Sequence, residues 1–171
     1  MTAARRERKS HRLGGALAAI LGVVVAAMGF GPASTPIIAA TTELVVANRF
    51  TGLAIDGFDP VAYFVDDAPR IGRAELEVRF AGATWRFQNE GNRAAFVADP
   101  DVYMPRFGGY DPIVVARGAA TSGHPKLWLI AGKRLYLFYS AEARAAFAEN
   151  PDRVIESAER YWPEVLRTLS P

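Results

Sequence analysis

The chain has 171 residues, half of them hydrophobic, and contains no cysteine, which excludes disulfides, thiolate metal sites and cysteine nucleophiles. Five of the 20 basic residues and one of the 18 acidic residues lie in residues 1–40, so residues 41–171 carry 15 basic and 17 acidic residues, a net charge of −2. That part has no basic excess to attract a nucleic-acid backbone, and we expect no nucleic-acid partner.

Residues 1–40 have the composition of a targeting segment. A basic stretch, residues 5–12, precedes an uncharged apolar run, residues 13–30, and small residues follow. This order predicts a secretory signal peptide cleaved before Thr41, so that residues 41–171 form one exported domain. The apolar run is 18 residues long, the lower limit for a membrane span, so an N-terminal membrane anchor stays open. The arginine pair in the basic stretch leaves both the Sec and the twin-arginine export routes open.

The exported part is predicted to begin with short elements around a turn. The apolar run at residues 44–47 indicates an edge strand or a lead-in segment. Gly57 and Pro60 supply the backbone angles of a turn at residues 56–60. The apolar run that follows, residues 61–65, indicates a buried strand.

A β-hairpin and a helix are predicted next. Residues 75–80 alternate strictly between polar and apolar side chains, which is typical of a half-buried strand. Residues 84–87 return after a two-residue turn and complete the hairpin. Asn89 is a good N-cap residue, so we expect a helix from there through Ala98.

The middle of the chain contains a proline- and glycine-rich bend. Pro105 and Pro112 have a fixed φ, and they flank Gly108 and Gly109, which tolerate almost any backbone angle. Such a segment cannot form a regular helix. It predicts a specific bend that leads into a strand at residues 113–115.

A second hairpin and helix follow the bend. The strands are predicted at residues 126–130 and 134–138, and Ser140 is expected to cap a helix that runs to Asn150. A C-terminal helix comes last, with one apolar stripe at helical spacing. Pro163 lies inside that pattern and is expected to kink the helix or restart it.

The two halves resemble one another in sequence. Residues 93–96 and 144–147 are both Arg-Ala-Ala-Phe, at an offset of 51, and the turn at residues 81–82 matches Ala-Gly at residues 131–132, at an offset of 50. We infer two β-hairpin–helix units, although chance likeness between two alanine-rich helices stays open as an explanation. The predicted class is α+β: a small antiparallel sheet built from these units, with a C-terminal amphipathic helix.

Several motifs, in order, resemble those of the YHS domain family. They are residues 57–64 (GFDPVAYF), 82–87 (GATWRF), Asn92-Arg93 with Phe96, the bend with Pro105 and Gly108-Gly109-Tyr110, Trp128, Leu135-Tyr136-Leu137 and Trp162-Pro163. The resemblance covers nearly all of residues 50–165 and is to exported bacterial proteins built around one YHS domain, which implies a periplasmic location. The family is often suggested to bind metal, copper among others, because related modules occur with copper-transporting pumps and some hydroxylases.

The chain departs from that family pattern at two candidate metal ligands. Asp111 stands where the family typically has cysteine, and a carboxylate is a hard oxygen donor, whereas copper(I) prefers sulfur. His124 stands where similar proteins usually carry an acidic residue. With the thioether of Met104, these two residues would bind a divalent ion weakly. The alternatives are a turn-capping carboxylate at Asp111 and a solvated loop histidine at His124.

We expect a non-catalytic binding module with a pocket where the two halves meet. Tyr63, Tyr110 and Trp128 are the candidate ligand-binding residues, beside Asp111 and His124, and the ligand is a divalent metal ion such as copper or a small molecule. The alternative is a structural or interaction domain that has lost the family's metal ligand. The sequence has no Gly-x-Ser-x-Gly elbow and no P-loop, so we predict no enzyme activity. The oligomeric state stays open.

Overall fold

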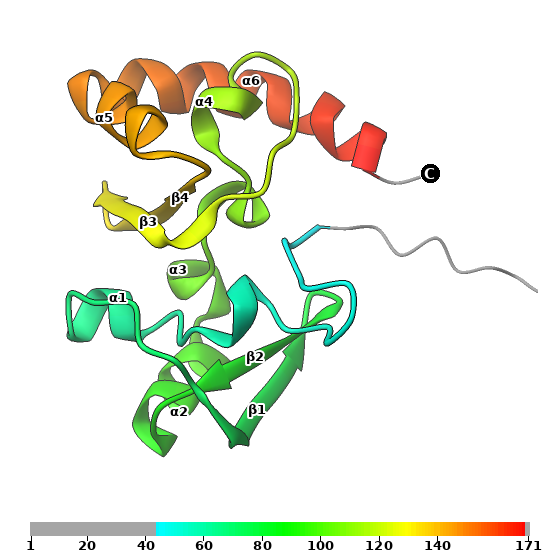
Figure 1. Ribbon diagram of the computed structural model, residues 1–171, viewed down its shortest axis with the longest axis vertical. Helices are drawn as coiled ribbons and strands as arrows, with labels where there is room; N and C mark the ends of the chain where they lie inside the picture. The colour runs from blue at the N-terminus through cyan, green and yellow to red at the C-terminus, as the bar shows by residue number, and fades with distance from the viewer. Residues whose placement is uncertain (1–43, 170–171) are drawn as a thin grey trace, which may run out of the picture. The chain divides into compact units, whose positions relative to one another are not determined.

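Two β-hairpins, each followed by a helix, dominate the fold (Figure 1). The computed structural model describes residues 44–169, which belong to one compact unit, and the predicted signal peptide or anchor, residues 1–40, lies outside them. The strands are β1 (Arg73–Phe80), β2 (Ala83–Phe87), β3 (His124–Ala131) and β4 (Arg134–Phe138). They form two antiparallel two-stranded sheets, β1-β2 and β3-β4. The predicted α+β class is confirmed, with each hairpin as a sheet of its own.

The two hairpins have the same register and the same kind of turn. In each hairpin the strand pairing shifts once, between Arg73 and Glu77 in the first and between His124 and Trp128 in the second. Ala131 pairs with Arg134, so Gly132 and Lys133 form the second turn, and both have positive φ like residues 81–82 of the first turn. Such two-residue turns suit the right-handed twist of a hairpin. The predicted match at an offset of 50 is therefore wrong, because the turns are related by 51 residues.

The helices after the hairpins begin where the sequence predicts. Asn89 caps α2 (Glu90–Ala98) and Ser140 caps α5 (Ala141–Glu149), and each cap side chain accepts a hydrogen bond from the backbone N–H three residues further on. These bonds satisfy backbone donors that the first turn of a helix leaves unpaired. The aromatic contacts are also the same in both units, since the helix Phe packs on two strand rings. The pairs are Trp85–Phe96, Phe87–Phe96, Tyr136–Phe147 and Phe138–Phe147, with centroids 4.9–5.2 Å apart.

Two predicted strands are short helices in the structure. Residues 61–65 contribute to α1 (Ala62–Val65), and residues 113–115 belong to α4 (Pro112–Val115). A short apolar run fits a buried strand and a buried helical turn equally well by periodicity alone. The preceding aspartates decide, because their carboxylates accept backbone N–H groups that open a helical turn.

Each of these helices follows a left-handed turn. Three consecutive residues have positive φ in η1 (Ile55–Gly57), and three have positive φ in η2 (Arg106–Gly109). In η2 they are Phe107, Gly108 and Gly109, so the predicted bend is present. A side chain at Gly108 would overlap the carbonyl oxygen of Leu44, and glycine is required there for space as well as for φ.

The structural repeat is longer than the sequence indicates. Residues 54–65 correspond to residues 106–117, at an offset of 52, and residues 70–103 correspond to residues 121–154, at an offset of 51. We call residues 54–103 repeat 1 and residues 106–154 repeat 2. The single-residue difference falls in the loop between the short helix and the hairpin, where no strand or helix register is disturbed.

The last helix, α6 (Pro151–Leu169), begins like α3 (Pro100–Tyr103) of repeat 1 and then continues. It runs through Pro163 as one helix, so the predicted restart does not occur. The predicted apolar stripe is buried or half-buried along its whole length and packs mainly on α4. In Figure 1, α6 and α5 lie with the second hairpin, α2 lies with the first, and α3 lies between the two groups. Among residues 44–169, no helix is both long and apolar enough to cross a membrane.

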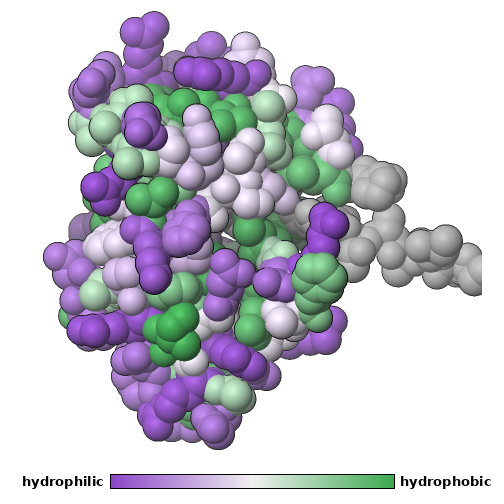
Figure 2. Space-filling view, viewed as in Figure 1, coloured by the Kyte–Doolittle hydropathy of each residue, from purple (hydrophilic) through white to green (hydrophobic). Residues whose placement is uncertain are grey.

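Each repeat has its own apolar core. The first core contains Trp85, Phe87 and Phe96, and the second contains Tyr136, Phe138 and Phe147. Leu135 and Leu137 of β4 join the first core, which connects the repeats. On the face shown in Figure 2, hydrophobic residues lie in small groups between hydrophilic ones.

Candidate functional site

A cavity of about 430 Å³ lies where the two repeats meet, and Met104 is the one predicted site residue in its lining. The β1-β2 hairpin, the segment between the repeats, β4 and α6 each contribute to its walls. The lining residues are Leu44, Val45, Ala81, Trp85, Asp101, Met104, Pro105, Arg106, Phe107, Gly108, Arg134, Trp162 and Leu166. The walls are therefore mainly apolar and aromatic, with two arginines and one aspartate.

Local backbone structure places the aromatic walls. Trp85 is completely buried, and its indole N–H donates to the carbonyl oxygen of Phe80 (3.1 Å), which fixes the ring across the hairpin. The left-handed turn η2 directs Phe107 inward, where its ring meets the edge of Trp162 at a centroid distance of 5.5 Å. Edge-to-face packing of this kind holds both rings in a defined orientation.

Arg106 is held at the cavity by three interactions. Its guanidinium forms an ion pair with Glu159 of α6 (2.6 Å) and lies 5.5 Å from the centroid of the Phe107 ring. Its charge also acts on the buried Tyr136 hydroxyl, since burial raises the pKa of Tyr136 and Arg106 opposes that increase. The side chain of Arg106 remains 35% exposed and that of Glu159 52% exposed, so their ion pair is accessible to solvent.

Arg134 is held differently. It is half-buried at the start of β4, and its guanidinium donates a hydrogen bond to the backbone carbonyl of Asp101. No carboxylate within the described part of the chain forms an ion pair with it. A guanidinium has five N–H donors, so most of the hydrogen-bonding capacity of Arg134 remains for water or a ligand.

Two of the predicted ligand-binding residues contact one another outside this cavity. Tyr63 is completely buried, donates its hydroxyl proton to the carbonyl oxygen of Pro125 (2.9 Å) and packs edge-on against Trp128 at 5.3 Å. Burial raises the pKa of Tyr63, and the nearby charge of Asp59 adds to the increase. The third, Tyr110, is buried and packs on Trp162, 6.1 Å away. All three belong to the apolar cores or pack against them, and none lines the cavity.

The candidate ligand Asp111 is completely buried and caps α4. One carboxylate oxygen accepts the N–H of Ile113 (2.8 Å), and the other accepts the N–H of Tyr139 (2.9 Å). Loss of hydration through burial raises the pKa of Asp111, and these backbone hydrogen bonds oppose the increase. Both oxygens therefore bind the protein's own backbone, which matches the turn-capping alternative.

The other two candidate metal ligands have different environments. His124 is exposed at the start of β3, and its Nδ1 accepts a hydrogen bond from the N–H of Lys126 (3.1 Å). Met104 is half-buried and is the one predicted site residue that lines the cavity. Among the residues that the structure describes, no group of three or more His, Asp or Glu side chains is placed to hold a metal ion.

A second cavity, of about 340 Å³, lies between α4 and α6. The corresponding place in repeat 1 is filled by Phe64 and Tyr103, whose rings pack edge to face at 5.5 Å. Repeat 2 has Ala116 and Val154 at these positions, and the smaller side chains leave the space open. The lining residues are Ile113, Ala116, Arg117, Arg153, Val154 and Ser157.

Sequence reasoning did not find Arg106, Arg134 or Trp162 as site residues. The signal that identifies the arginines is the internal repeat, because repeat 1 has Ala54 and Ala83 at the corresponding positions. Arg106 is matched to Ala54 by the offset of 52, and Arg134 is matched to Ala83 by the offset of 51. Both offsets come from the structure. Comparison of the chain with family models, curated proteins and solved structures gave no match.

Proposed function

We propose that this protein is an exported, non-catalytic binding module that holds a small organic molecule in the cavity between its repeats. The observation that carries the proposal is the cavity itself, with Trp85, Phe107 and Trp162 on its walls. Ligand sites in proteins are typically concave, mostly apolar and about 300–1,000 Å³ in volume, with a few polar groups. The cavity of about 430 Å³ agrees with that description in size and lining.

Export of the domain and its likeness to YHS-domain proteins are part of this proposal. Their support is the composition of residues 1–40 and the motifs of residues 50–165. The small-molecule form of the proposal is preferred to the metal form because both oxygens of Asp111 accept backbone hydrogen bonds. The same observation favours one alternative: a structural or interaction domain that retained the fold after losing a metal ligand.

A blocking variant tests the proposal. Leu166 lines the cavity, so Leu166→Trp adds a large ring where the ligand would lie, while Tyr161→Trp adds the same ring at an exposed position of the same helix. Naphthalene-sized probes suit the volume, and we would use 1-naphthaleneacetic acid and its neutral amide. Calorimetric titration of the purified protein should detect binding of at least one probe. Leu166→Trp should weaken binding about tenfold or more, which is about 1.4 kcal/mol, and Tyr161→Trp should leave it unchanged.

Two results would contradict this function. One is the absence of measurable binding of both probes to the wild-type protein at millimolar concentration. The other is binding that Leu166→Trp leaves unchanged while its circular dichroism and melting temperature match the wild type, because the probe would then lie elsewhere.

A further inference from the structure

The two arginines of the cavity have no charged counterparts in repeat 1. Arg106 corresponds to Ala54, and Arg134 corresponds to Ala83. The two alanines are 0% and 3% exposed and belong to the first apolar core. Repeat 2 thus carries two cations where repeat 1 carries buried methyl groups, and both cations line the cavity.

Placing guanidinium groups beside an apolar cavity is costly unless they have partners. A partly desolvated charge loses hydration, and it recovers that loss through hydrogen bonds to acceptors or to anions. Arg106 has Glu159 as a partner, but Arg134 has only the backbone carbonyl of Asp101 among the described residues. Asp101 is also the one acidic residue of the lining, so the lining carries two positive charges and one negative charge.

From this asymmetry we infer that the cavity binds a small organic carboxylate, with its carboxylate group on Arg134 and Arg106 and its apolar body against Trp162 and Leu166. The inference rests on the proposed function, whose ligand it specifies. Arginine binds carboxylates through two parallel N–H···O bonds, and it does so more strongly where water is partly excluded. Glu159 is then a competitor of the ligand, because its own carboxylate pairs with Arg106 in the described structure.

The matched acid and amide probes separate charge from shape. The wild-type protein should bind 1-naphthaleneacetic acid at least about tenfold more tightly than its amide, as a charge-assisted hydrogen bond implies. Arg134→Gln should remove most of this preference and leave the affinity for the amide unchanged. Arg144→Gln, which makes the same change at an exposed position of α5, should alter neither affinity.

Glu159→Gln gives a result that a merely structural role cannot produce. It releases Arg106 from its ion pair, so the affinity for the acid should increase severalfold while that for the amide stays constant. Equal binding of acid and amide by the wild type, or equal losses for both in Arg134→Gln, would overturn the inference and leave the binding function standing. Absence of binding for both probes would instead remove the binding function itself.

Discussion

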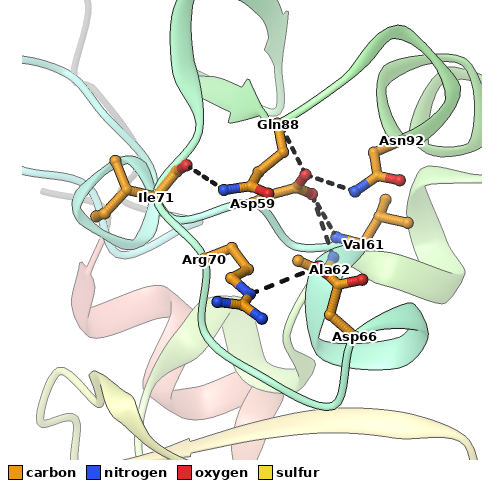
Figure 3. A network of polar contacts seen from close by, with 8 residues as sticks. All are labelled: Asp59, Val61, Ala62, Asp66, Arg70, Ile71, Gln88 and Asn92. Carbon is orange, nitrogen blue, oxygen red and sulfur yellow. Dashed lines mark hydrogen bonds and ion pairs between the residues drawn. The ribbon is translucent and has the colours of Figure 1, made fainter.

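Asp59 and Asp111 hold equivalent positions in the two repeats, and each is completely buried with its carboxylate bound to backbone N–H groups. Each joins the start of a short helix to the residue that follows its hairpin, Gln88 in repeat 1 and Tyr139 in repeat 2. Asp59 does more than Asp111: Figure 3 shows its carboxylate also accepting the side-chain amide of Asn92 (2.7 Å). An aspartate therefore makes the same connection in both repeats, between the start of the short helix and the residue after the hairpin.

We expect Asp59→Ala to destabilise the protein by about 3 kcal/mol or more, because it leaves several buried donors without an acceptor. Asp111→Ala should cost less, since its carboxylate accepts fewer hydrogen bonds. Urea unfolding followed by circular dichroism measures both values. Equal losses for the two variants would contradict this ranking.

The buried carboxylate of Asp111 also predicts a dependence of stability on pH. Its pKa is raised in the folded protein, so the folded state binds this proton more tightly than the unfolded state. The resulting stabilisation is complete below the ordinary aspartate pKa of about 4 and is lost as the pH rises through the raised pKa. In Asp111→Asn this contribution is absent, so the stability of the wild type relative to the variant should fall from pH 3 to pH 7. Urea unfolding of both proteins across this range tests it, and an increase with pH would contradict it.

Two glycines with positive φ should respond differently to alanine. A Cβ at Gly108 would overlap the carbonyl oxygen of Leu44, whereas one at Gly82 would meet nothing within 4 Å. Gly82→Ala should therefore cost only the strain of its backbone angle, about 1 kcal/mol, and Gly108→Ala should cost several times more. Melting temperatures of the two variants provide the comparison. Similar values would show that the segment at Leu44 moves away without cost.

The ring pair of repeat 1 indicates how to fill the second cavity, which lies between α4 and α6. The double variant Ala116→Phe, Val154→Tyr restores the ring pair that Phe64 and Tyr103 form, and we expect a gain of about 1 kcal/mol in unfolding free energy. Each single variant should gain less, because one ring lacks its partner. Val97→Tyr adds a ring at an exposed position and serves as the control. A double variant less stable than the wild type would mean that the backbones of the repeats differ there.

Metal affinity should be low. We predict that copper(II) and zinc(II) bind no more tightly than micromolar, because few soft ligands exist and the oxygens of Asp111 are engaged. Calorimetric titration with each metal ion measures this affinity. A nanomolar affinity that Asp111→Ala abolishes would refute the prediction.

Local sequence was a sufficient guide where the pattern was long. The strict alternation at residues 75–80 and the caps Asn89 and Ser140 predicted the hairpin and both helices correctly. The apolar runs at residues 61–65 and 113–115 were too short for their period to distinguish strand from helix. Their helical conformation follows from backbone N–H groups that donate to the carboxylates of Asp59 and Asp111 at the start of each turn. The same carboxylates also accept the N–H groups of Gln88 and Tyr139, almost thirty positions away, which only the tertiary structure brings close.

Composition and local pattern by themselves determined the α+β class, the absence of any cysteine chemistry, the two similar units and the presence of the bend, which the structure places at the start of the second unit. Only the tertiary structure decided where the cavity lies and that Arg106, Arg134 and Trp162 meet there. The physical reason is that these side chains come from separate elements, and their proximity depends on how the elements pack. A pattern read along the chain reports which face of an element is apolar, whereas the space left between packed elements depends on the volumes of side chains from all of them.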